Sequence, residues 1–256
     1  MVEPILISIE GNIGSGKSTL FESLKRRHPD WHFIPEPVDK WLLFKNEEGK
    51  SMLELFYADR KRWALTFQSL VIVTRREALL SAILSWRANG YPGSNIFISE
   101  RCAFTDKNVF VENLWAEGYM DSLERSVFTS QYAAVWSDVV KPAGFIYVQT
   151  SPEICAERIH GRGRKGENSI PLIYLKDLHR LHDRWLENSH NTLVIKNDEP
   201  KSKEPDIFEP RDDEFPFPIN SVSDWILTLA ERFSGRGPSA DGRDHYPCRH
   251  LDRISV

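Results

Sequence analysis

One short segment of the chain, residues 11–18, constrains the fold more strongly than any other. Its sequence, G-N-I-G-S-G-K-S, fits the pattern G-x-x-x-x-G-K-[ST], in which glycines let backbone N–H groups curl around phosphate oxygens. An apolar run at residues 5–9 precedes this segment, and apolar residues at helical spacing follow it through Leu20 and Leu24. The sequence therefore predicts a strand, a glycine turn and a helix whose N-terminus faces a bound phosphate.

The same segment predicts a set of nucleotide contacts. Lys17 is expected to reach the β- and γ-phosphates of a nucleoside triphosphate, and the Ser18 hydroxyl to bind Mg²⁺. The ATP-binding residues predicted in this loop are Gly11, Asn12, Ile13, Gly14, Ser15, Gly16, Lys17, Ser18 and Thr19.

Strand and helix signals alternate along the rest of the chain. Further strands are predicted by apolar runs at residues 31–34, 95–99, 144–149 and 192–195. Helices are predicted at residues 51–86, at 102–140 with a break near Gly118, after Pro152, after Pro171 and at 222–233. The alternation indicates an α/β fold, in which a five-stranded, doubly wound parallel sheet is wrapped by helices.

The expected domain covers residues 1–233 and includes a charged surface loop at 196–218. Residues 234–256 lack a periodic apolar face and are expected to be disordered.

Composition limits the function classes. The net charge of −4 argues against broad attachment to nucleic acid. No apolar run approaches the ~18 residues that span a bilayer, and the first strand begins too close to Met1 for a signal peptide. Cys102, Cys155 and Cys248 have no close spacing, which favours a reducing compartment without disulfides or zinc. We therefore expect a soluble, cytoplasmic protein with no membrane or nucleic-acid partner.

A phosphate-binding loop serves both kinases and nucleotide-operated switches. A switch of the GTPase type usually carries a D-x-x-G element and an N-K-x-D reader of guanine, and neither string occurs in this chain. A kinase is therefore favoured, and its chemistry requires a base, a metal-binding carboxylate and arginines that neutralise charge. A kinase for a nucleoside monophosphate or another small hydroxyl substrate stays open, as does a nucleotide-binding module without catalysis.

Two acidic positions at predicted strand ends suit this chemistry. Glu36 lies between two prolines after the second strand, where ligands gather in open α/β sheets, and can accept a hydroxyl proton. Glu100 and Arg101 follow the third strand and suit Mg²⁺ binding and phosphate orientation. The alternatives are an exposed turn glutamate for Glu36 and a structural ion pair for Glu100–Arg101.

Three arginines, Arg158, Arg162 and Arg164, run from a predicted helix into a glycine-flanked loop. Such guanidinium groups neutralise the charge that grows on a phosphoryl group during transfer. The alternative is a solvated basic loop. His179 and His182 lie three residues apart on a predicted helix, but no pattern completes a metal site around them, so we expect surface or packing roles.

In this order, the motifs resemble those of the deoxynucleoside kinase family. The matching strings are I-E-G-N-I-G-S-G-K-S-T (9–19), P-E-P-V (35–38), Trp41, F-Q (67–68), E-R (100–101), R-I-H-G-R-G-R (158–164) and I-P-L-I-Y-L-K-D-L-H (170–179). The resemblance implies a P-loop kinase fold, ATP as phosphoryl donor, Mg²⁺, a deoxynucleoside acceptor and a homodimer. Glu36 would be the general base for the 5′-hydroxyl, Arg101 would align the reacting groups, and Glu100 would bind Mg²⁺.

The resemblance also implies a substrate pocket. Its predicted residues are Tyr57 and Glu167 for the sugar 3′-hydroxyl, Gln68 and Phe110 for the base, Trp41, Phe67 and Val71 for the walls, and Arg158, Arg162 and Arg164 for a lid. From the residues alone, the aromatic side chains Trp41, Tyr57, Phe67 and Phe110 could hold a planar base, but aromatic residues on helices more often belong to the core.

Two charged positions bear on the choice of base. Arg75 and Asp106 occupy places where the deoxycytidine and deoxyguanosine kinase branch has a charged pair and thymidine-accepting members tend to be apolar. The resemblance therefore favours deoxycytidine and purine deoxynucleosides over thymidine. The family commonly has serine after E-R, whereas this chain has Cys102, which puts a hydroxyl contact there in doubt.

Overall fold

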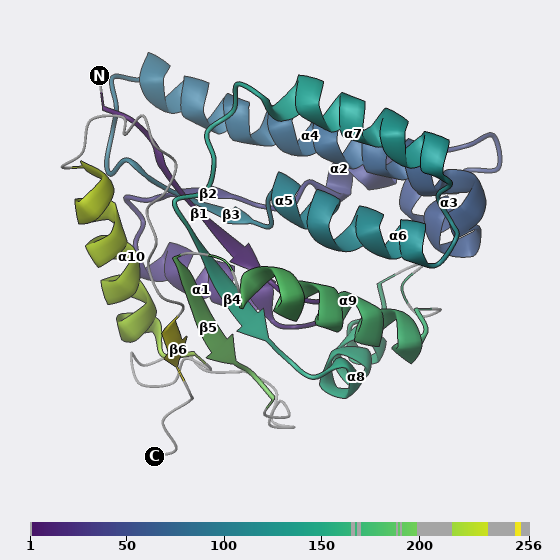
Figure 1. Cartoon of the computed structure of the whole chain (residues 1–256). Coiled ribbons are helices and arrows are strands. Elements are labelled where there is room, and N and C mark those ends of the chain that lie inside the picture. The colour runs from purple at the N-terminus through teal and green to yellow at the C-terminus, as the bar shows by residue number, and fades with distance from the viewer. Residues whose placement is uncertain are drawn as a thin grey trace.

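The computed structural model describes residues 2–164, 167, 170–187, 189, 191–198, 217–234 and 249–251. They form one parallel sheet with the strand order β2-β3-β1-β4-β5-β6 (Figure 1). Its strands are β1 (Ile5–Glu10), β2 (His32–Ile34), β3 (Ile96–Glu100), β4 (Gly144–Gln149), β5 (Thr192–Lys196) and β6 (Arg249–Leu251).

The first five strands confirm the five that the sequence predicts. The sixth, β6, is an addition: it pairs with β5 and lies inside the segment 234–256 that was expected to be disordered, an expectation that does not hold for these three residues. Ser234, the first residue of that segment, ends a helix. Residues 235–248 and 252–256, and residues 199–216 of the expected surface loop, lie outside the described residues.

Helices cover both faces of the sheet. They are α1 (Lys17–Arg27), α2 (Val38–Leu43), α3 (Met52–Ala58), α4 (Arg60–Ala88), α5 (Ala103–Thr105), the π-helix η1 (Asp106–Val111), α6 (Glu112–Ala116), α7 (Ser122–Trp136), α8 (Pro152–Arg162), α9 (Leu172–Leu186) and α10 (Ile219–Ser234). Among the described residues no helix is long and apolar enough to cross a bilayer.

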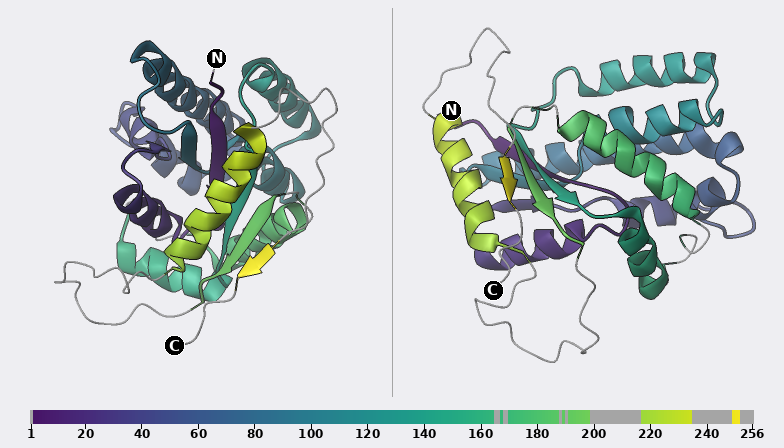
Figure 2. Two further views of the ribbon diagram at one scale, coloured as in Figure 1. Left: turned by 90° about the vertical axis from the view of Figure 1, so that its left-hand side faces the viewer. Right: turned by 60° about the horizontal axis from the view of Figure 1, so that its bottom comes forward.

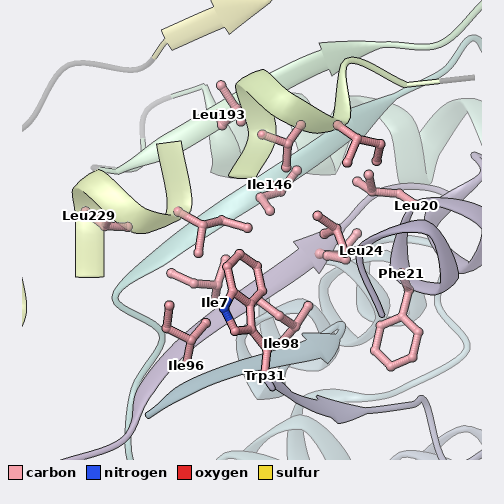
Figure 3. Packing of buried hydrophobic residues seen from close by; sticks show 14 of the residues in the cluster. Ile7, Leu20, Phe21, Leu24, Trp31, Ile96, Ile98, Ile146, Leu193 and Leu229 are labelled. Atoms are coloured by element: carbon pink, nitrogen blue, oxygen red, sulfur yellow. The ribbon is translucent and has the colours of Figure 1, made fainter. Parts of the chain in front are cut away.

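Alternating side chains of β1 divide the core into two layers, because successive residues of a strand point to opposite faces. Ile5, Ile7 and Ile9 pack against α1 and α10 on one face, in the cluster drawn in Figure 3. Leu6 packs on the other face, against α4. Figure 2 shows α10 lying across the strands, on the opposite side of the sheet from α4 and α7.

Local capping explains why the long helical stretch at 51–86 is two helices. The Ser51 hydroxyl and the Glu54 carboxylate form a capping box that begins α3. The Asp59 side chain accepts the Arg62 amide at 3.0 Å and begins α4, so the chain breaks between them. The predicted break near Gly118 is also present, since Gly118 has a φ of 72° directly after α6.

The segment after β3 contains a feature that the sequence did not predict. Where regular helix was expected, the chain forms the short helix α5 and then η1. π-Helical turns are rare and often occur at functional sites. Here η1 carries Asp106 and Phe110.

Candidate active site

The loop at residues 11–18, which we call the glycine loop, has the backbone that its sequence predicts. Gly11 and Gly14 have φ values of 143° and 78°, which favour glycine. A Cβ at Gly11 would lie 2.5 Å from the Val148 carbonyl oxygen, and one at Gly14 would lie 2.6 Å from that of Cys155. Side chains larger than hydrogen are therefore excluded, and α1 begins at once with Lys17.

Lys17 is buried at the start of α1. Its ammonium donates to the Asn12 carbonyl oxygen at 2.6 Å. Burial lowers the pKa of Lys17 to about 7, and the nearby Arg101 cation acts in the same direction. Next to it, the Ser18 hydroxyl donates to Glu100 Oε1 at 2.7 Å, so a hydroxyl and a carboxylate from α1 and β3 meet beside the glycine loop.

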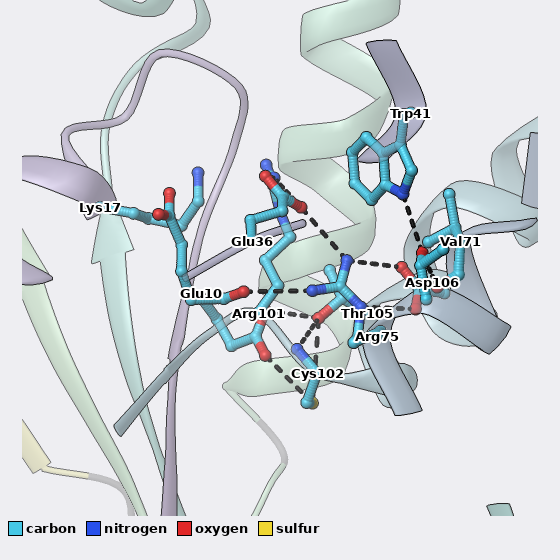
Figure 4. A network of polar contacts seen from close by, with 12 residues as sticks. Glu10, Lys17, Glu36, Trp41, Val71, Arg75, Arg101, Cys102, Thr105 and Asp106 are labelled. Carbon is cyan, nitrogen blue, oxygen red and sulfur yellow. Dashed lines mark hydrogen bonds and ion pairs between the residues drawn. The ribbon is translucent and has the colours of Figure 1, made fainter. Parts of the chain in front are cut away.

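A buried network of charges forms at the carboxyl ends of β2 and β3 (Figure 4). Arg101 Nη1 donates to both oxygens of Glu36, at 2.9 and 2.8 Å. Arg75 Nη2 donates to Glu36 Oε1 at 3.2 Å, and Arg75 also makes a two-point contact with Asp106, at 2.9 and 3.1 Å. We call these four residues, Glu36, Arg75, Arg101 and Asp106, the acceptor network.

The charges around Glu36 set its protonation. Burial alone raises the pKa of a carboxyl group, but Arg101, Arg75 and Lys17 together hold the pKa of Glu36 at about 2. Glu36 is thus ionised at neutral pH. It is neither an exposed turn glutamate nor isolated from the glycine loop, since Arg101 Nη2 also donates to the Gly11 carbonyl oxygen at 3.1 Å.

A single cleft of about 1020 Å³ connects the glycine loop with the acceptor network. All of the site residues predicted from the sequence line it, apart from Gly11, Asn12 and Ser15 of the loop itself. Sequence reasoning missed several lining residues, which are Val38, Asp39, Leu53, Phe56, Ile154, Glu157, Gly161 and Tyr174. Leu53 lies on α3 one helical turn before Tyr57, so helical spacing from that residue was a signal that pointed to it, whereas the adjacent Phe56 had no such signal.

One part of the cleft is lined by aromatic side chains and by the amide of Gln68. Trp41 meets Phe67 edge to face, and its Nε1 donates to Thr74 Oγ1 at 3.0 Å, which fixes the indole. Gln68 is buried, and its Oε1 has no hydrogen-bond partner among the described residues. A buried oxygen without a partner is costly, so Gln68 is suited to receive a donor from a planar ligand.

The predicted lid arginines are held at the other side of the cleft. Arg158 donates to the carbonyl oxygens of Ser15 and Asn197, at 3.3 and 3.1 Å. Arg162 and Arg164 both bind the Glu167 carboxylate, the latter at 3.1 Å. These contacts exclude a purely solvated basic loop.

Other expectations fall outside the cleft. His179 pairs with Asp183 at 3.3 Å, and His182 is buried with Nδ1 against the Leu178 carbonyl oxygen, which are packing roles. The Cys102 thiol, at the position where the family commonly has serine, donates to Glu10 Oε1 at 3.1 Å. Cys248 lies outside the described residues.

Comparison with known proteins agrees with this geometry. The family model for deoxynucleoside kinases matches residues 7–214. Human deoxycytidine kinase is 32% identical over 241 residues, which cover 87% of this chain and 91% of the relative. Chicken deoxycytidine kinase 2 is 34% identical over 206 residues, which cover 75% of this chain and 77% of the relative. Human mitochondrial thymidine kinase 2 is 32% identical over 222 residues (84% and 79%).

The family match covers most of the chain, and the glycine loop, the acceptor network and the lid arginines all lie within it. The chain therefore belongs to the deoxynucleoside kinase family and uses ATP as its phosphoryl donor.

Proposed function

We propose that this kinase phosphorylates the 5′-hydroxyl of deoxycytidine and of purine deoxynucleosides in preference to thymidine, with Glu36 as the general base. The observation that carries the proposal is the place of Glu36. Its carboxylate lies in the same cleft as the glycine loop and is tied to that loop through Arg101. A hydroxyl bound beside Glu36 would face the γ-phosphate of ATP held by Lys17.

The proposed step moves one phosphoryl group and one proton. The 5′-oxygen bonds to the γ-phosphorus, the bond from that phosphorus to ADP breaks, and Glu36 takes the hydroxyl proton. The pKa of about 2 keeps Glu36 ionised but makes it a weak base. We expect the negative charge of bound ATP to offset the nearby cations and so to raise the pKa of Glu36, while Arg101, the strongest of the cations that lower it, stays in contact with the carboxylate.

Mg²⁺ fits between the two halves of the cleft. The Ser18 hydroxyl and the Glu100 carboxylate line the cleft 2.7 Å apart, and oxygen ligands of this kind are those that Mg²⁺ prefers. Ser18 and Glu100 would hold the ion, which neutralises charge on the phosphates when bound.

Recognition of the acceptor involves both sides of the cleft. Gln68 would pair with the base, Phe110 would stack on it, and Trp41, Phe67 and Val71 would form the walls. Tyr57 and Glu167 would bind the 3′-hydroxyl. Because Arg162 and Arg164 hold Glu167, sugar binding and lid position would be coupled.

The charged pair Arg75–Asp106 supports the choice of base. Both side chains line the cleft and are held together by a two-point contact. Fixed charges facing the base would disfavour the apolar methyl group of thymine. The named relatives include deoxycytidine kinases and a thymidine kinase, so the family match alone leaves the base open.

A homodimer and a reducing, cytoplasmic location are part of the proposal. Exposed apolar side chains lie on the neighbouring helices α4 and α7, namely Val73, Leu84, Leu123 and Val127. Such a surface suits a partner copy, and light scattering would measure the mass in solution.

Cys102 and Cys155 are buried free thiols, as in a reducing compartment, and fractionation of cells would locate the protein.

The decisive experiment is Glu36→Gln. Removing the base should lower kcat for deoxycytidine by about 10²–10⁴-fold, while calorimetry should find ATP affinity within about threefold of wild type. The screen includes the four deoxynucleosides and deoxycytidine monophosphate. Retained phosphorylation in the variant would remove Glu36 as base, and phosphorylation of the monophosphate alone would favour a nucleoside monophosphate kinase. ATP binding without transfer to any acceptor would favour a non-catalytic module.

A further inference from the structure

A second carboxylate, Glu10, is buried behind the acceptor network and has no part in the mechanism above. It is the last residue of β1, its exposed fraction is 0%, and it does not line the cleft (Figure 4). Glu10 therefore cannot touch ATP or the acceptor directly. Any influence on the reaction must pass through its neighbours.

Three side chains donate hydrogen bonds to Glu10. Ser8 Oγ and Cys102 Sγ donate to Oε1, at 2.6 and 3.1 Å, and Thr105 Oγ1 donates to Oε2 at 2.6 Å. Thr105 Oγ1 also accepts the Cys102 amide at 3.3 Å. Two of the three donors thus belong to the turn that follows Arg101.

Arg101 itself has an unusual backbone. Its φ is 61°, in the left-handed region that side chains other than glycine rarely adopt. Such a conformation persists only where the surroundings over-determine it. On one side, the Arg101 amide donates to the Ile9 carbonyl oxygen at 2.9 Å; on the other, Cys102 and Thr105 are tied to Glu10.

We propose that Glu10 is a positioning residue, which acts through Cys102 and Thr105 to hold Arg101 in the left-handed conformation that aims its guanidinium at Glu36. This inference rests on the proposed role of Glu36 for its catalytic consequence, but the placement of Arg101 can be tested without it. The carboxyl group of Glu10 suits the task because its two oxygens accept all three hydrogen bonds.

The variants test separately the two hydrogen-bond donors that lie on the turn after Arg101 and the one donor that lies in β1. Glu10→Gln turns an NH₂ group toward at least one donor, and Thr105→Val and Cys102→Ala each remove a donor on the turn. Ser8→Ala is the matched control, because Ser8 bonds to the same carboxylate from within β1. Cys102→Ser keeps a donor and should retain the activity of the wild type.

The expected result is a loss of kcat by about tenfold to a hundredfold in Glu10→Gln and Thr105→Val, with a smaller loss in Cys102→Ala and ATP affinity unchanged. The Ser8→Ala variant should stay within about twofold of wild type. A second readout is the carboxyl ¹³C titration of Glu36 in the protein without substrate. If Arg101 leaves Glu36, the pKa of Glu36 should rise in the first three variants and not in Ser8→Ala.

Several outcomes would overturn the proposal. One is an unchanged Glu36 titration in Thr105→Val and Cys102→Ala, which would reduce Glu10 to a fold-stabilising group. Another is a loss of kcat in Ser8→Ala as large as that in Thr105→Val. If Glu10→Gln does not fold, the other two variants still decide the question. If instead Glu36→Gln stays active while Glu10→Gln raises the pKa of Glu36, the proposed function fails and the positioning role stands.

Discussion

The arginines of the acceptor network and those of the proposed lid differ in what holds them. Arg75 and Arg101 have side chains only 6% exposed and bind Glu36 and Asp106 in the wall of the cleft. Arg162 and Arg164 are 35% and 37% exposed, and both rest on one carboxylate, Glu167. The first pair is part of the folded core, whereas the second lies at the surface of the cleft.

This difference in burial indicates which arginines are fixed in position before the substrate binds. Breaking a buried ion pair by removing one partner leaves a buried charge without compensation, which typically costs about 3–5 kcal/mol. Exposed pairs contribute about 0–1 kcal/mol. The acceptor network should therefore be coupled to stability. Glu167 is itself buried, but two arginines share it, so one of them can turn to a phosphate while the other still compensates the carboxylate.

The largest expected effect comes from Arg101→Lys, which keeps the charge and removes the planar fork. Loss of the two contacts to Glu36 and of the contact to Gly11 should lower kcat by about 10³-fold. Thermal unfolding should occur at a clearly lower temperature as well, because the site is buried. A fall in activity with an unchanged Tm would break the proposed coupling between this network and stability.

Arg162→Lys is the matched change in the lid. Here kcat should fall by about 10²-fold, since one donor to the transferring phosphoryl group is lost. Tm should stay within about 1–2 °C of wild type, because the lysine keeps the charge and Arg164 still pairs with Glu167. Scanning calorimetry beside steady-state kinetics measures both. Equal Tm losses in the two lysine variants would remove the contrast between network and lid.

A third change tests whether the buried network also selects the base. In the double variant Arg75→Met with Asp106→Ala, kcat/KM for thymidine relative to deoxycytidine should rise by about tenfold or more. The pair is removed together so that neither charge is left buried alone. Competition between the two deoxynucleosides at fixed ATP gives the ratio, and an unchanged ratio would refute the role of this pair in base choice.

The smallest effect concerns Lys17, the one cation of the glycine loop whose charge depends on pH near neutrality. Its pKa of about 7 leaves it mostly neutral at pH 8 in the free protein, and ATP phosphates should raise that pKa. Binding at pH 8 should therefore take up at most about one proton. At pH 6 Lys17 is already charged, and this uptake should vanish.

Calorimetry of ATP binding in two buffers of different ionisation enthalpy measures that uptake. Lys17→Arg is the control, because a guanidinium stays protonated at both pH values. Identical uptake in this variant at pH 8 would assign the proton to another group.

Local sequence patterns gave much of the fold and of the donor side. The glycine loop could be recognised because its glycines, Lys17 and Ser18 act within one short turn. The five longer strands could be found from their apolar runs. By contrast, η1 could not be predicted, because its residues also suit an ordinary helix and only packing selects the wider turn.

For the candidate site, the resemblance to a family assigned some residues to the pocket, such as Trp41 and Phe67. Their spacing alone could not decide whether they belong to the core or to the pocket. Tyr174 and Phe56 were missed, because an aromatic side chain on a helix is usually part of the core, and only the positions of the neighbouring elements show that it lines a pocket.

The sequence by itself determined the parallel α/β architecture and the phosphate-binding turn, since both depend on short-range periodicity and on the backbone freedom of glycine. Only the tertiary structure decided that Glu36, Arg75, Arg101 and Asp106 meet, because they come from four separate elements that the sheet and α4 bring together. The left-handed Arg101 and its link to Glu10 were likewise invisible in the sequence. Such contacts depend on long-range packing, which no local pattern specifies.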